Sequence, residues 1–396
     1  MNGPDAAGGA PLVFLVAGEP SGDALGGRLM AALKRATGGR IRFSGVGGER
    51  MAAEGLVSQF SLDDLAVMGL AEVLPRLPRL LARLRETGAA IAAQRPNIVV
   101  TIDSPSFTLR VARKARAIGV PVVHYVAPQL WAWRSGRARK LGRCIDHLLL
   151  VLPFEPEFFA SLGVPCTYVG HPAVEDGTIA GNGAAFRARH GIALDTPLLA
   201  VLPGSRRGVV ERMLPIFGAA VRLLAKRIPT LHLVVPVVAG TATTIETALE
   251  SWPVRATLVR TIEDKRDAYA AASAALSASG TATLELALAG VPMVVAYRAS
   301  ALTAFIARRM IEVRIFGLPN LVAGRVVAPE LIQENCTPEA LAREIERLID
   351  DPAERARQIA GWQEVRRRLA IEGAGPSERA AQVVLSLIGR PAGGPA

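Results

Sequence analysis

The sequence predicts an α/β protein made of two doubly wound, Rossmann-like domains. Short apolar runs rich in β-branched residues alternate with longer amphipathic runs, which is the pattern of a parallel sheet covered by helices. The alternation starts twice, near residues 12 and 198 of the 396-residue chain, and each start leads into a glycine-containing turn and a helical pattern. A chain of this length usually exceeds what one core supports. We therefore expect an N-terminal domain over residues 1–180 and a C-terminal domain over residues 181–396.

The first half contains five apolar runs that predict strands. These lie near Leu12–Ala17, Ile41–Val46, Ile98–Ile102, Val120–Val126 and His147–Leu152. Helical spacing of apolar residues between them predicts helices at Gly26–Ala36, Pro75–Ala93 and Thr108–Ile118. A stretch rich in Gly and Ala, residues 173–185, interrupts the alternation, so we expect the two domains to be joined near residues 173–190.

The second half repeats the alternation. Its predicted strands lie near Leu198–Leu202, Leu231–Val235, Ala256–Val259, Ala274–Ala278 and Met293–Ala296. From Pro338 to Ile388 the chain shows helical patterns with many arginines, which we assign to the second domain as a basic end.

Charge and cysteine content restrict the partners and the compartment. The formal net charge is +11 and the pI is about 10.4, which indicates an anionic partner: a nucleic acid, a phosphorylated substrate or an acidic membrane surface. Three cysteines far apart in sequence, Cys144, Cys166 and Cys336, imply neither a disulfide framework nor a metal site. No apolar run approaches the roughly 18 residues of a membrane span, so we expect a cytosolic protein.

The turn after the first predicted strand argues against a bound dinucleotide. Its glycines, Gly18, Gly22 and Gly26, do not form the G-x-G-x-x-G pattern. Glu19 and Asp23 place carboxylates where a pyrophosphate would lie. Because neither half of the chain has that pattern, an NAD-linked dehydrogenase is disfavoured.

The corresponding turn of the second half, "LPGSRRGVVERM", lacks these acids. Gly204 and Ser205 offer backbone amides and a hydroxyl, and Arg206 and Arg207 bring positive charge to the start of a helix. This combination predicts an anion site. The alternative is an ordinary helix cap with solvated arginines.

A second candidate ligand loop is the segment "SASGTATLELAL". A predicted strand ends at Ala278, the loop Ser279, Gly280 and Thr281 follows, and Glu285 lies on the first turns of the next helix. Loop amides can hold a phosphate, and a carboxylate one turn deeper can accept hydrogen bonds from a ribose diol. A capping Thr with an acid that stabilises the helix start explains the same residues.

Three further segments place polar or aromatic side chains after strands. Asp103 in "TIDSPSF" is placed as a general base, although an Asp before Ser-Pro is commonly a turn or N-cap residue. In "APQLWAWRSGRARK", Gln129, Trp131 and Trp133 precede a basic run; they bind sugar, lipid or nucleic acid, or pack a loop. His171 in "VGHP" is more typical of a structural turn than of a catalytic base. The sequence contains no D-x-D pair, H-E-x-x-H motif or Cys/His cluster, so we expect no metal site.

Several motifs occur in order from residue 17 to 333: "AGEPSGD", "IDSPSF", "APQLWAW", "PFE" with "VGHP", "LPGSR", "ASGTATLELAL", and "LPNLVAG" followed by "PELIQ". Taken together, and in this order, they resemble the lipid-A-disaccharide synthase family. The resemblance implies an inverting glycosyltransferase of the GT-B type with a cleft between its two domains. Its reaction would join UDP-2,3-diacylglucosamine to 2,3-diacylglucosamine 1-phosphate through a β-1,6 bond and release UDP.

The resemblance also implies roles for the candidate residues. Asp103 is the expected catalytic base for the acceptor 6-hydroxyl. The expected UDP-binding residues are Gly204, Ser205, Arg206, Ser279, Gly280, Thr281, Glu285 and Asn320. The expected acceptor-side residues are Glu19, Ser21, Asp23 and Gln129, with helix capping by Ser21 or Asp23 as the alternative. No metal and no cofactor are expected.

The implied partners are the two acylated sugars and an anionic inner-membrane surface, with no nucleic acid and with a possible homodimer. A Gram-negative source and work at the inner face of the cytoplasmic membrane are implied as well. The segment Leu65–Arg85 mixes apolar residues with four arginines, and we expect Pro75 and Pro78 to break it into short pieces. It lies in the membrane interface or packs as an ordinary helix on the first sheet. A non-catalytic nucleotide-sugar or membrane-binding protein of the same fold is the alternative function.

Overall fold

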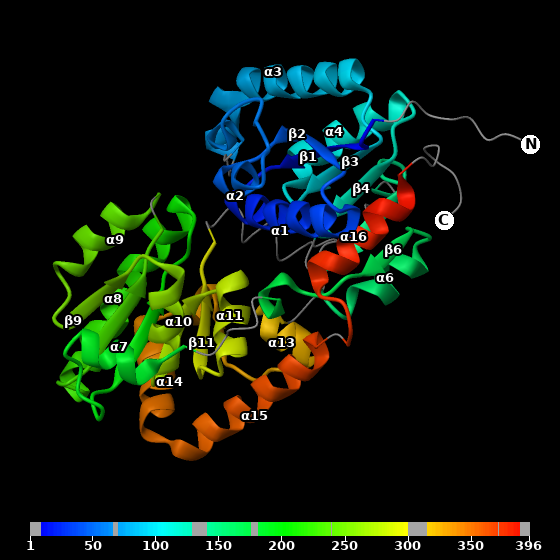
Figure 1. The fold of residues 1–396 in the computed structure, drawn as a ribbon. Helices are drawn as coiled ribbons and strands as arrows, with labels where there is room; N and C mark the ends of the chain where they lie inside the picture. Colours follow the sequence, from blue (N-terminus) through cyan, green and yellow to red (C-terminus); the bar gives the residue numbers. More distant parts are fainter. Residues whose placement is uncertain are drawn as a thin grey trace, which may run out of the picture. The chain divides into compact units, whose positions relative to one another are not determined.

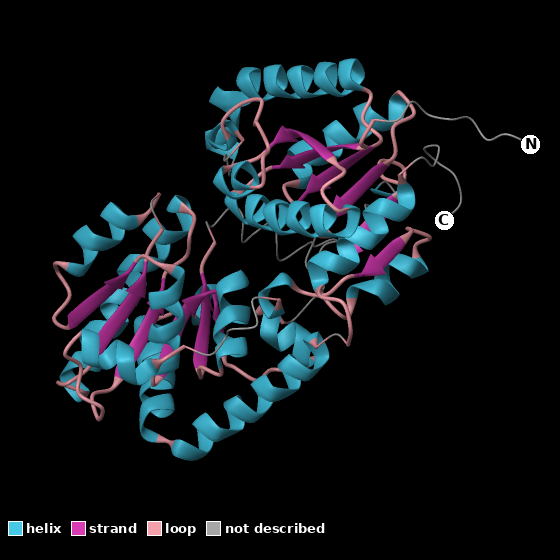
Figure 2. Ribbon diagram, in the orientation of Figure 1, coloured by secondary structure: helices cyan, strands magenta, loops and turns pink. Residues whose placement is uncertain are grey.

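Two six-stranded parallel sheets form the framework of the chain (Figures 1 and 2). The computed structural model describes residues 9–65, 70–128, 141–175, 181–238, 240–299, 315–370 and 372–388, and of residues 70–76 only the backbone. The described residues divide into two compact units. The first unit contains the residues up to Glu175 and those from 372 onward, and the second contains residues 181–370.

The first unit has the strand order β2-β1-β3-β4-β5-β6. Its strands are β1 (Leu12–Ala17), β2 (Arg42–Val46), β3 (Ile98–Ile102), β4 (Val122–Tyr125), β5 (His147–Leu150) and β6 (Cys166–Tyr168). Its α-helices are α1 (Pro20–Thr37), α2 (Glu49–Ala53), α3 (Leu70–Gln94), α4 (Pro105–Ala117), α6 (Glu155–Ser161) and α16 (Pro376–Leu387). Helices α3 and α4 lie on one side of the sheet, while α1 and α16 lie side by side on the other (Figure 1).

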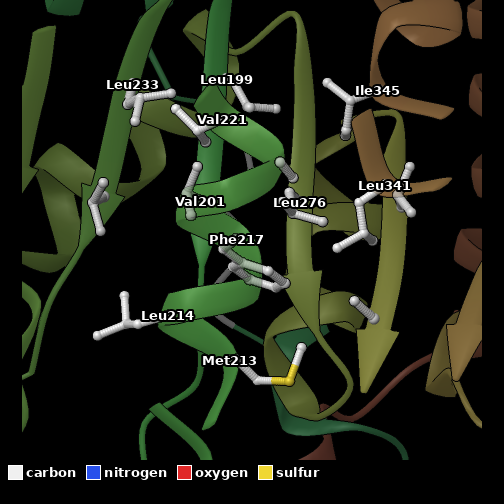
Figure 3. Close-up of a cluster of buried hydrophobic side chains, with 14 of the residues drawn as sticks. Leu199, Val201, Met213, Leu214, Phe217, Val221, Leu233, Leu276, Leu341 and Ile345 are labelled. Carbon is white, nitrogen blue, oxygen red and sulfur yellow. The ribbon is translucent and has the colours of Figure 1, made fainter. Parts of the chain in front are cut away.

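The second unit has the strand order β12-β11-β10-β7-β8-β9. Its strands are β7 (Leu198–Leu202), β8 (His232–Pro236), β9 (Arg255–Val259), β10 (Ala274–Ala278), β11 (Met293–Tyr297) and β12 (Glu330–Ile332). Its α-helices are α7 (Gly183–Arg189), α8 (Arg207–Arg227), α9 (Ala242–Leu249), α10 (Ile262–Ala271), α11 (Thr281–Ala289), α13 (Leu318–Ala323), α14 (Pro338–Asp350) and α15 (Pro352–Leu369). Figure 3 shows Phe217 and Val221 of α8 packed against Val201 of β7 and Leu276 of β10 in the core of this unit.

Each sheet has one point at which the direction of chain progress reverses. In the first sheet it lies between β1 and β3, and in the second it lies between β7 and β10. Helices that follow neighbouring strands at such a point leave to opposite faces, so ligands of open parallel sheets bind at the carboxyl ends of these strands. The residues directly after β1, β3, β7 and β10 are therefore the first place to look for a site.

The fold class is confirmed, and ten of the twelve strands lie where the sequence predicts them. The two others, β6 and β12, have three residues each and lie at the outer edges of their sheets. Runs this short do not produce a recognisable alternation of apolar residues. The predicted joining segment also contains a helix, α7, which packs against α10.

The assignment of all C-terminal helices to the second domain was wrong for α16. This helix belongs to the first unit, where its buried residues, Val384 among them, pack beside α1. The start of the helix is held by Glu175, whose carboxylate accepts hydrogen bonds from the backbone N–H of Ser377 (2.8 Å) and from its hydroxyl (2.5 Å). A return of the chain to its first unit leaves no signal in local composition or spacing.

The prediction that Pro75 and Pro78 break the following segment was also wrong. The helix α3 continues through both prolines for 25 residues. Each proline removes a single N–H donor, and the turns after them are anchored because Leu84 and Ile91 pack on the core of the first unit. No helix among the described residues is both long and apolar enough to cross a membrane.

Candidate active site

The carboxyl ends of β1 and β3 meet in a very close contact between Gly18 and Ser104. A Cβ atom on Gly18 would lie 2.1 Å from the Cβ of Ser104 and 2.6 Å from its hydroxyl oxygen. Only glycine leaves room for this approach, which explains the glycine that ends the first apolar run. The contact places the turn that carries Asp103 directly beside the turn that carries Glu19.

Asp103 and Ser104 form a strained turn between β3 and α4. Their φ angles are 51° and 46°, in the left-handed region that non-glycine residues rarely adopt. Hydrogen bonds hold this conformation: the Asp103 Oδ1 accepts from the Ser104 N–H (2.7 Å), and the Thr108 hydroxyl donates to the Asp103 carbonyl (2.6 Å). The Asp103 N–H also donates to the Tyr125 carbonyl (2.9 Å). Such strain, of about 1–3 kcal/mol per residue, is typical of functional sites.

Of the two alternatives for Asp103, a turn residue is correct and an N-cap residue is wrong. The N-cap residue of α4 is Ser104, whose side chain makes no capping hydrogen bond, and Asp103 lies in the turn before it. The half-buried Asp103 carboxylate is oriented by the next residue's N–H and lies at the sheet edge where ligands bind.

The acids after β1 have different surroundings. The carboxylate of Asp23 is buried and accepts hydrogen bonds from the N–H groups of Gly48 (2.7 Å), Arg50 (2.9 Å) and Met51 (3.1 Å), so it caps α2. Capping by Asp23 is therefore correct, but the capped helix is a different one from its own. Glu19 is half-buried at the N-cap position of α1, and Ser21 is exposed on the first turn.

Two further predicted features of the first unit can be placed only in part. Gln129, Trp131 and Trp133 lie outside the described residues. His171 uses its Nδ1 atom to accept a hydrogen bond from the Ala173 N–H (3.1 Å), which is the structural role that the sequence favours. Burial and the charge of Arg28 lower the pKa of His171 to about 4, so its imidazole is neutral at pH 7.

In the second unit, the turn after β7 presents exposed cationic side chains. Gly204 has a φ of 121°, and a Cβ atom there would lie 2.9 Å from Val209 Cγ1, so the sharp turn requires glycine. Arg206 is the N-cap residue of α8, and Ser205, Arg206 and Arg207 are exposed. Arg207 pairs with Glu211 at 2.7 Å. The macrodipole of a 21-residue helix adds to the positive potential of this turn.

The loop after β10 begins α11 with no side-chain cap. The N-cap residue is Gly280, so the alternative of Thr281 as a cap is wrong. Thr281 is the first helical residue and is exposed. Glu285 lies one turn further, with its side chain 38% exposed. Its carboxylate is paired with Lys265 of α10 at 2.8 Å, a partner 20 residues away that no motif indicates.

Asn320, the remaining predicted donor-site residue, has a structural environment. Its side chain is fully buried, and its Oδ1 accepts from the N–H groups of Val327 (2.9 Å) and Ala328 (3.0 Å). Its Nδ2 donates to the Ala328 carbonyl (2.8 Å) and to Glu330 Oε1 (2.7 Å). These four bonds use the whole hydrogen-bonding capacity of the amide, so Asn320 shapes the segment around α13.

The structure thus groups the predicted residues into two sets. Glu19 and Asp103 flank the reversal point of the first sheet, and the turns at Gly204 and Ser279 flank that of the second. The sequence missed Ser104, Thr108 and Lys265, which hold these residues in place. The close contact at Ser104 had one signal in the sequence, the glycine at position 18 that ends the first apolar run, but spacing does not identify the residue that Gly18 contacts.

The described residues contain no cluster of three or more His, Cys, Asp or Glu side chains that could bind a metal ion. The chemistry that the two sets support is that of a carboxylate base in the first unit and an anion-binding turn with a nearby carboxylate in the second.

Comparison with known proteins agrees with these features. The family described as lipid-A-disaccharide synthetase matches residues 13–384. A lipid-A-disaccharide synthase of Rhodospirillum centenum is 53% identical over 379 residues, covering 95% of this chain and 94% of its own. One from Paramagnetospirillum magneticum is 48% identical over 381 residues, covering 95% of this chain and 97% of its own.

Solved structures share the fold at low sequence identity. A UDP-GlcNAc 2-epimerase of Neisseria meningitidis bound to UDP-GlcNAc has a TM-score of 0.62 at 15% identity and covers 95% of this chain and 98% of its own. MurG of Acinetobacter baumannii has a TM-score of 0.54 at 16% identity and covers 96% of this chain and 99% of its own. The fold is therefore of the GT-B type. Because the family match spans most of its length and full-length relatives are about half identical to it, the chain belongs to the lipid-A-disaccharide synthase family.

Proposed function

We propose that this chain is an inverting glycosyltransferase that joins UDP-2,3-diacylglucosamine to 2,3-diacylglucosamine 1-phosphate. The products are a β-1,6-linked disaccharide 1-phosphate and UDP. The observation that carries the proposal is that, in a member of this family, each sheet presents at its reversal point the group that one half of the reaction needs. These groups are an oriented carboxylate in the first unit and a cationic turn in the second.

Asp103 is the base in this proposal. Its carboxylate removes the proton from the acceptor 6-hydroxyl while that oxygen attacks the anomeric carbon of the donor, which inverts the configuration there. The hydrogen bond from the Ser104 N–H and the strained turn hold the carboxylate in place at the carboxyl end of β3. Positioned base catalysis of this kind accelerates a reaction by about 10²–10⁴-fold.

The donor is held by the second unit. Arg206 and the amides of Gly204 and Ser205 stabilise the charge that develops on the β-phosphate as UDP leaves. The loop Ser279–Thr281 contributes amides at the start of α11, and Glu285 accepts hydrogen bonds from the ribose hydroxyls. Asn320 supports the donor site indirectly, because its hydrogen bonds hold the segment around α13 in place.

The acceptor lies on the first unit, beside Glu19 and Ser21 and with Gln129 as a further predicted contact. Asp23 supports this region indirectly, since its carboxylate holds the start of α2. We also propose a cytoplasmic location at the inner face of the cytoplasmic membrane of a Gram-negative bacterium, and self-association into a homodimer, which light scattering tests.

The membrane contact in this proposal is α3. Leu77 and Leu81 are each 37% exposed on it. Two of the arginines are less available for lipid phosphates than the sequence predicts. Arg79 and Arg83 both pair with the buried Asp64, at 2.6 and 2.8 Å. The leucines and Arg85 are therefore the groups that we expect to meet lipid.

The test is a single assay of UDP and disaccharide 1-phosphate formation from the two acylated sugars, with and without excess chelator. Turnover that survives the chelator supports a metal-free mechanism, and Asp103→Asn should reduce turnover by at least about 100-fold while UDP binding persists. Binding of both sugars without UDP release would instead identify a non-catalytic binding protein. Near-normal turnover of Asp103→Asn would remove Asp103 from the mechanism.

A further inference from the structure

The end of α15 carries three consecutive arginines, and two of them bind backbone carbonyls inside the second unit. The Nε of Arg366 donates to the Leu288 carbonyl at 2.8 Å, and its Nη2 donates to the same oxygen. The Nη1 of Arg368 donates to the Val322 carbonyl at 3.0 Å. Arg367, between them, is 76% exposed and pairs with Glu364 on its own helix.

The two bound carbonyls occupy equivalent positions at the ends of two helices. Leu288 lies two residues before Gly290, which ends α11 with a φ of 79°, and Val322 lies two residues before Gly324, which ends α13 with a φ of 68°. The cap N–H groups of the two glycines bond to other carbonyls of their helices. The last carbonyls of a helix lack intrahelical donors and carry the negative end of its dipole. A guanidinium placed there donates the missing hydrogen bond and also brings a favourable positive charge.

The guanidinium groups also lie close to the two glycines. A Cβ atom on Gly290 would lie 3.4 Å from Arg366 Nη2, and one on Gly324 would lie 3.2 Å from Arg368 Nη1. Each helix therefore ends in a left-handed glycine against which a cation from α15 packs. Figure 1 shows α15 running alongside both α11 and α13.

The helix that supplies the arginines is itself fixed to the sheet. The indole N–H of Trp362, 1% exposed, donates to the carbonyl of Val291, two residues before the start of β11, at 3.0 Å. The fully buried Gln358 accepts from the Met293 N–H, the first residue of β11, at 2.9 Å. The arginines of α15 thus connect the ends of α11 and α13 to a helix that is anchored at the start of β11.

The other ends of the same two helices lie at the proposed donor site. Helix α11 starts at Thr281 and carries Glu285, and it has only nine residues, so a shift of its last turn moves its first turn as well. Two residues before α13, the Phe316 carbonyl accepts a hydrogen bond from the Ser279 hydroxyl at 3.3 Å. A displacement of either helix therefore reaches the loop Ser279–Thr281.

We propose that α15 is a brace for the nucleotide site, and that Arg366 and Arg368 are positioning residues that set where α11 and α13 place Ser279, Thr281 and Glu285. The inference rests on the proposed function, because it deepens the UDP-binding role of that loop. In this proposal, two arginines of the basic C-terminal part act inside the second unit.

The experiment compares Arg366→Met, Arg368→Met and Arg367→Met, each of which removes a charge but keeps an unbranched side chain. Calorimetric titration with UDP is expected to show affinity weakened by roughly threefold to thirtyfold in the first two and unchanged in the third. In the full reaction, the KM for the UDP-sugar should rise in the first two, while the KM for the acceptor stays within about twofold. Arg366→Lys should recover part of the affinity, because an ammonium can still donate to the Leu288 carbonyl.

A purely stabilising role predicts a different pattern. It lowers the melting temperature of Arg366→Met without changing the UDP affinity of the folded protein, so UDP binding equal to that of Arg367→Met overturns the inference. If Arg366→Met folds poorly, Arg366→Lys carries the same comparison. A double-mutant cycle with Glu285→Ala adds a second criterion: positioning predicts effects on UDP affinity that are less than additive, and additive effects overturn it.

Failure of the proposed donor site is distinguishable. If Arg206→Ala and Glu285→Ala both leave UDP affinity unchanged, the site is elsewhere and the brace inference falls with it. If Glu285→Ala weakens UDP binding and Arg366→Met does not, the donor site stands and the brace alone is overturned.

Discussion

At the level of single residues, the contact between Gly18 and Ser104 is a tight constraint on the turn that carries Asp103. Gly18→Ala would bring a Cβ to 2.1 Å from the Ser104 Cβ, so the strained turn with Asp103 must move. We expect a loss of about 1–3 kcal/mol in the free energy of unfolding, as for other overpacked sites. We also expect turnover to fall by about tenfold or more, since displacement of a catalytic group is costly. Urea unfolding and steady-state kinetics measure the two effects.

A second substitution provides the control for that prediction. Ser104→Gly removes the atoms that clash and suits the φ of 46°, which leaves the residue's Cα as the nearest atom at 3.6 Å. The double variant Gly18→Ala/Ser104→Gly should recover most of the stability lost in Gly18→Ala. If it is no more stable than the single variant, the clash is not the cause.

Two histidines, His124, which is buried, and His171, which is half-buried, predict a loss of stability in mild acid. Burial lowers the pKa of His124 to about 4, and burial together with the charge of Arg28 lowers that of His171 to about 4. An unfolded histidine has a pKa of about 6.5, so between about pH 6.5 and 4 the unfolded chain binds protons that the folded chain does not. Stability is therefore full above about pH 6.5 and decreases as the pH falls.

Urea midpoints at pH 7 and pH 5 measure this effect. His171→Asn keeps an oxygen that can accept from the Ala173 N–H but does not titrate, so the difference between the two midpoints should shrink. A difference as large as in the parent protein would show that His171 does not contribute.

At this scale the sequence identifies candidates better than it identifies their roles. Asp103, Arg206 and Glu285 lie at the sheet edges that strand prediction implies. The structural roles of Asp23 and Asn320 depend on N–H groups 25 and 8 residues away, respectively, which no local pattern indicates. Short polar motifs look alike whether they bind a ligand or another part of the chain.

Among the elements, α3 divides its leucines between the core and the surface. Leu80 and Leu84 pack on the core, whereas Leu77 and Leu81 stay partly exposed. We expect the parent protein to sediment with anionic vesicles and Leu77→Gln/Leu81→Gln to bind at least about tenfold more weakly, because apolar area no longer leaves water. Val57→Gln is the matched control, since Val57 is 87% exposed on the same unit but outside α3.

Salt dependence separates the charged part of that interaction. Each arginine near an anionic surface contributes about 1 kcal/mol, so Arg85→Gln should reduce binding at low salt more than at high salt. Failure of the parent protein to sediment, or equal sedimentation of Leu77→Gln/Leu81→Gln, would exclude α3 as the membrane contact.

Elements were predictable where their own sequence determines them. Buried strands such as β3 and β10 are continuous apolar runs, and the sequence places both at their observed bounds. Proline was a poor guide in α3, because its cost is offset by tertiary packing that propensity does not include. The arginines of α15 belong to the predicted basic end of the chain, and two of the three at its last turn cap other helices, which the sequence does not indicate.

For the whole molecule, two separate parallel sheets were predictable and the return of the chain was not. Strand alternation restarts after residue 190, so two sheets follow from the sequence. That α16 packs beside α1, more than 300 residues earlier, depends on which apolar faces fit together. Only the tertiary structure contains that information.

The division into units predicts that UDP and core substitutions act on different parts of the chain, which peptide-resolved hydrogen exchange can measure. UDP at about 100 times its Kd should stabilise the unit that binds it by about 2.7 kcal/mol and slow exchange in β7 and β10, but not in β1 and β3.

Val384 of α16 and Val365 of α15 are both fully buried and serve as a matched pair. Val384→Ala should speed exchange in β1 and β3, because α16 belongs to the first unit, whereas Val365→Ala should speed it in β10 and β11. Faster exchange in β10 and β11 of Val384→Ala would mean that α16 stabilises the second unit instead, and protection of β1 and β3 by UDP would place the nucleotide on the first unit.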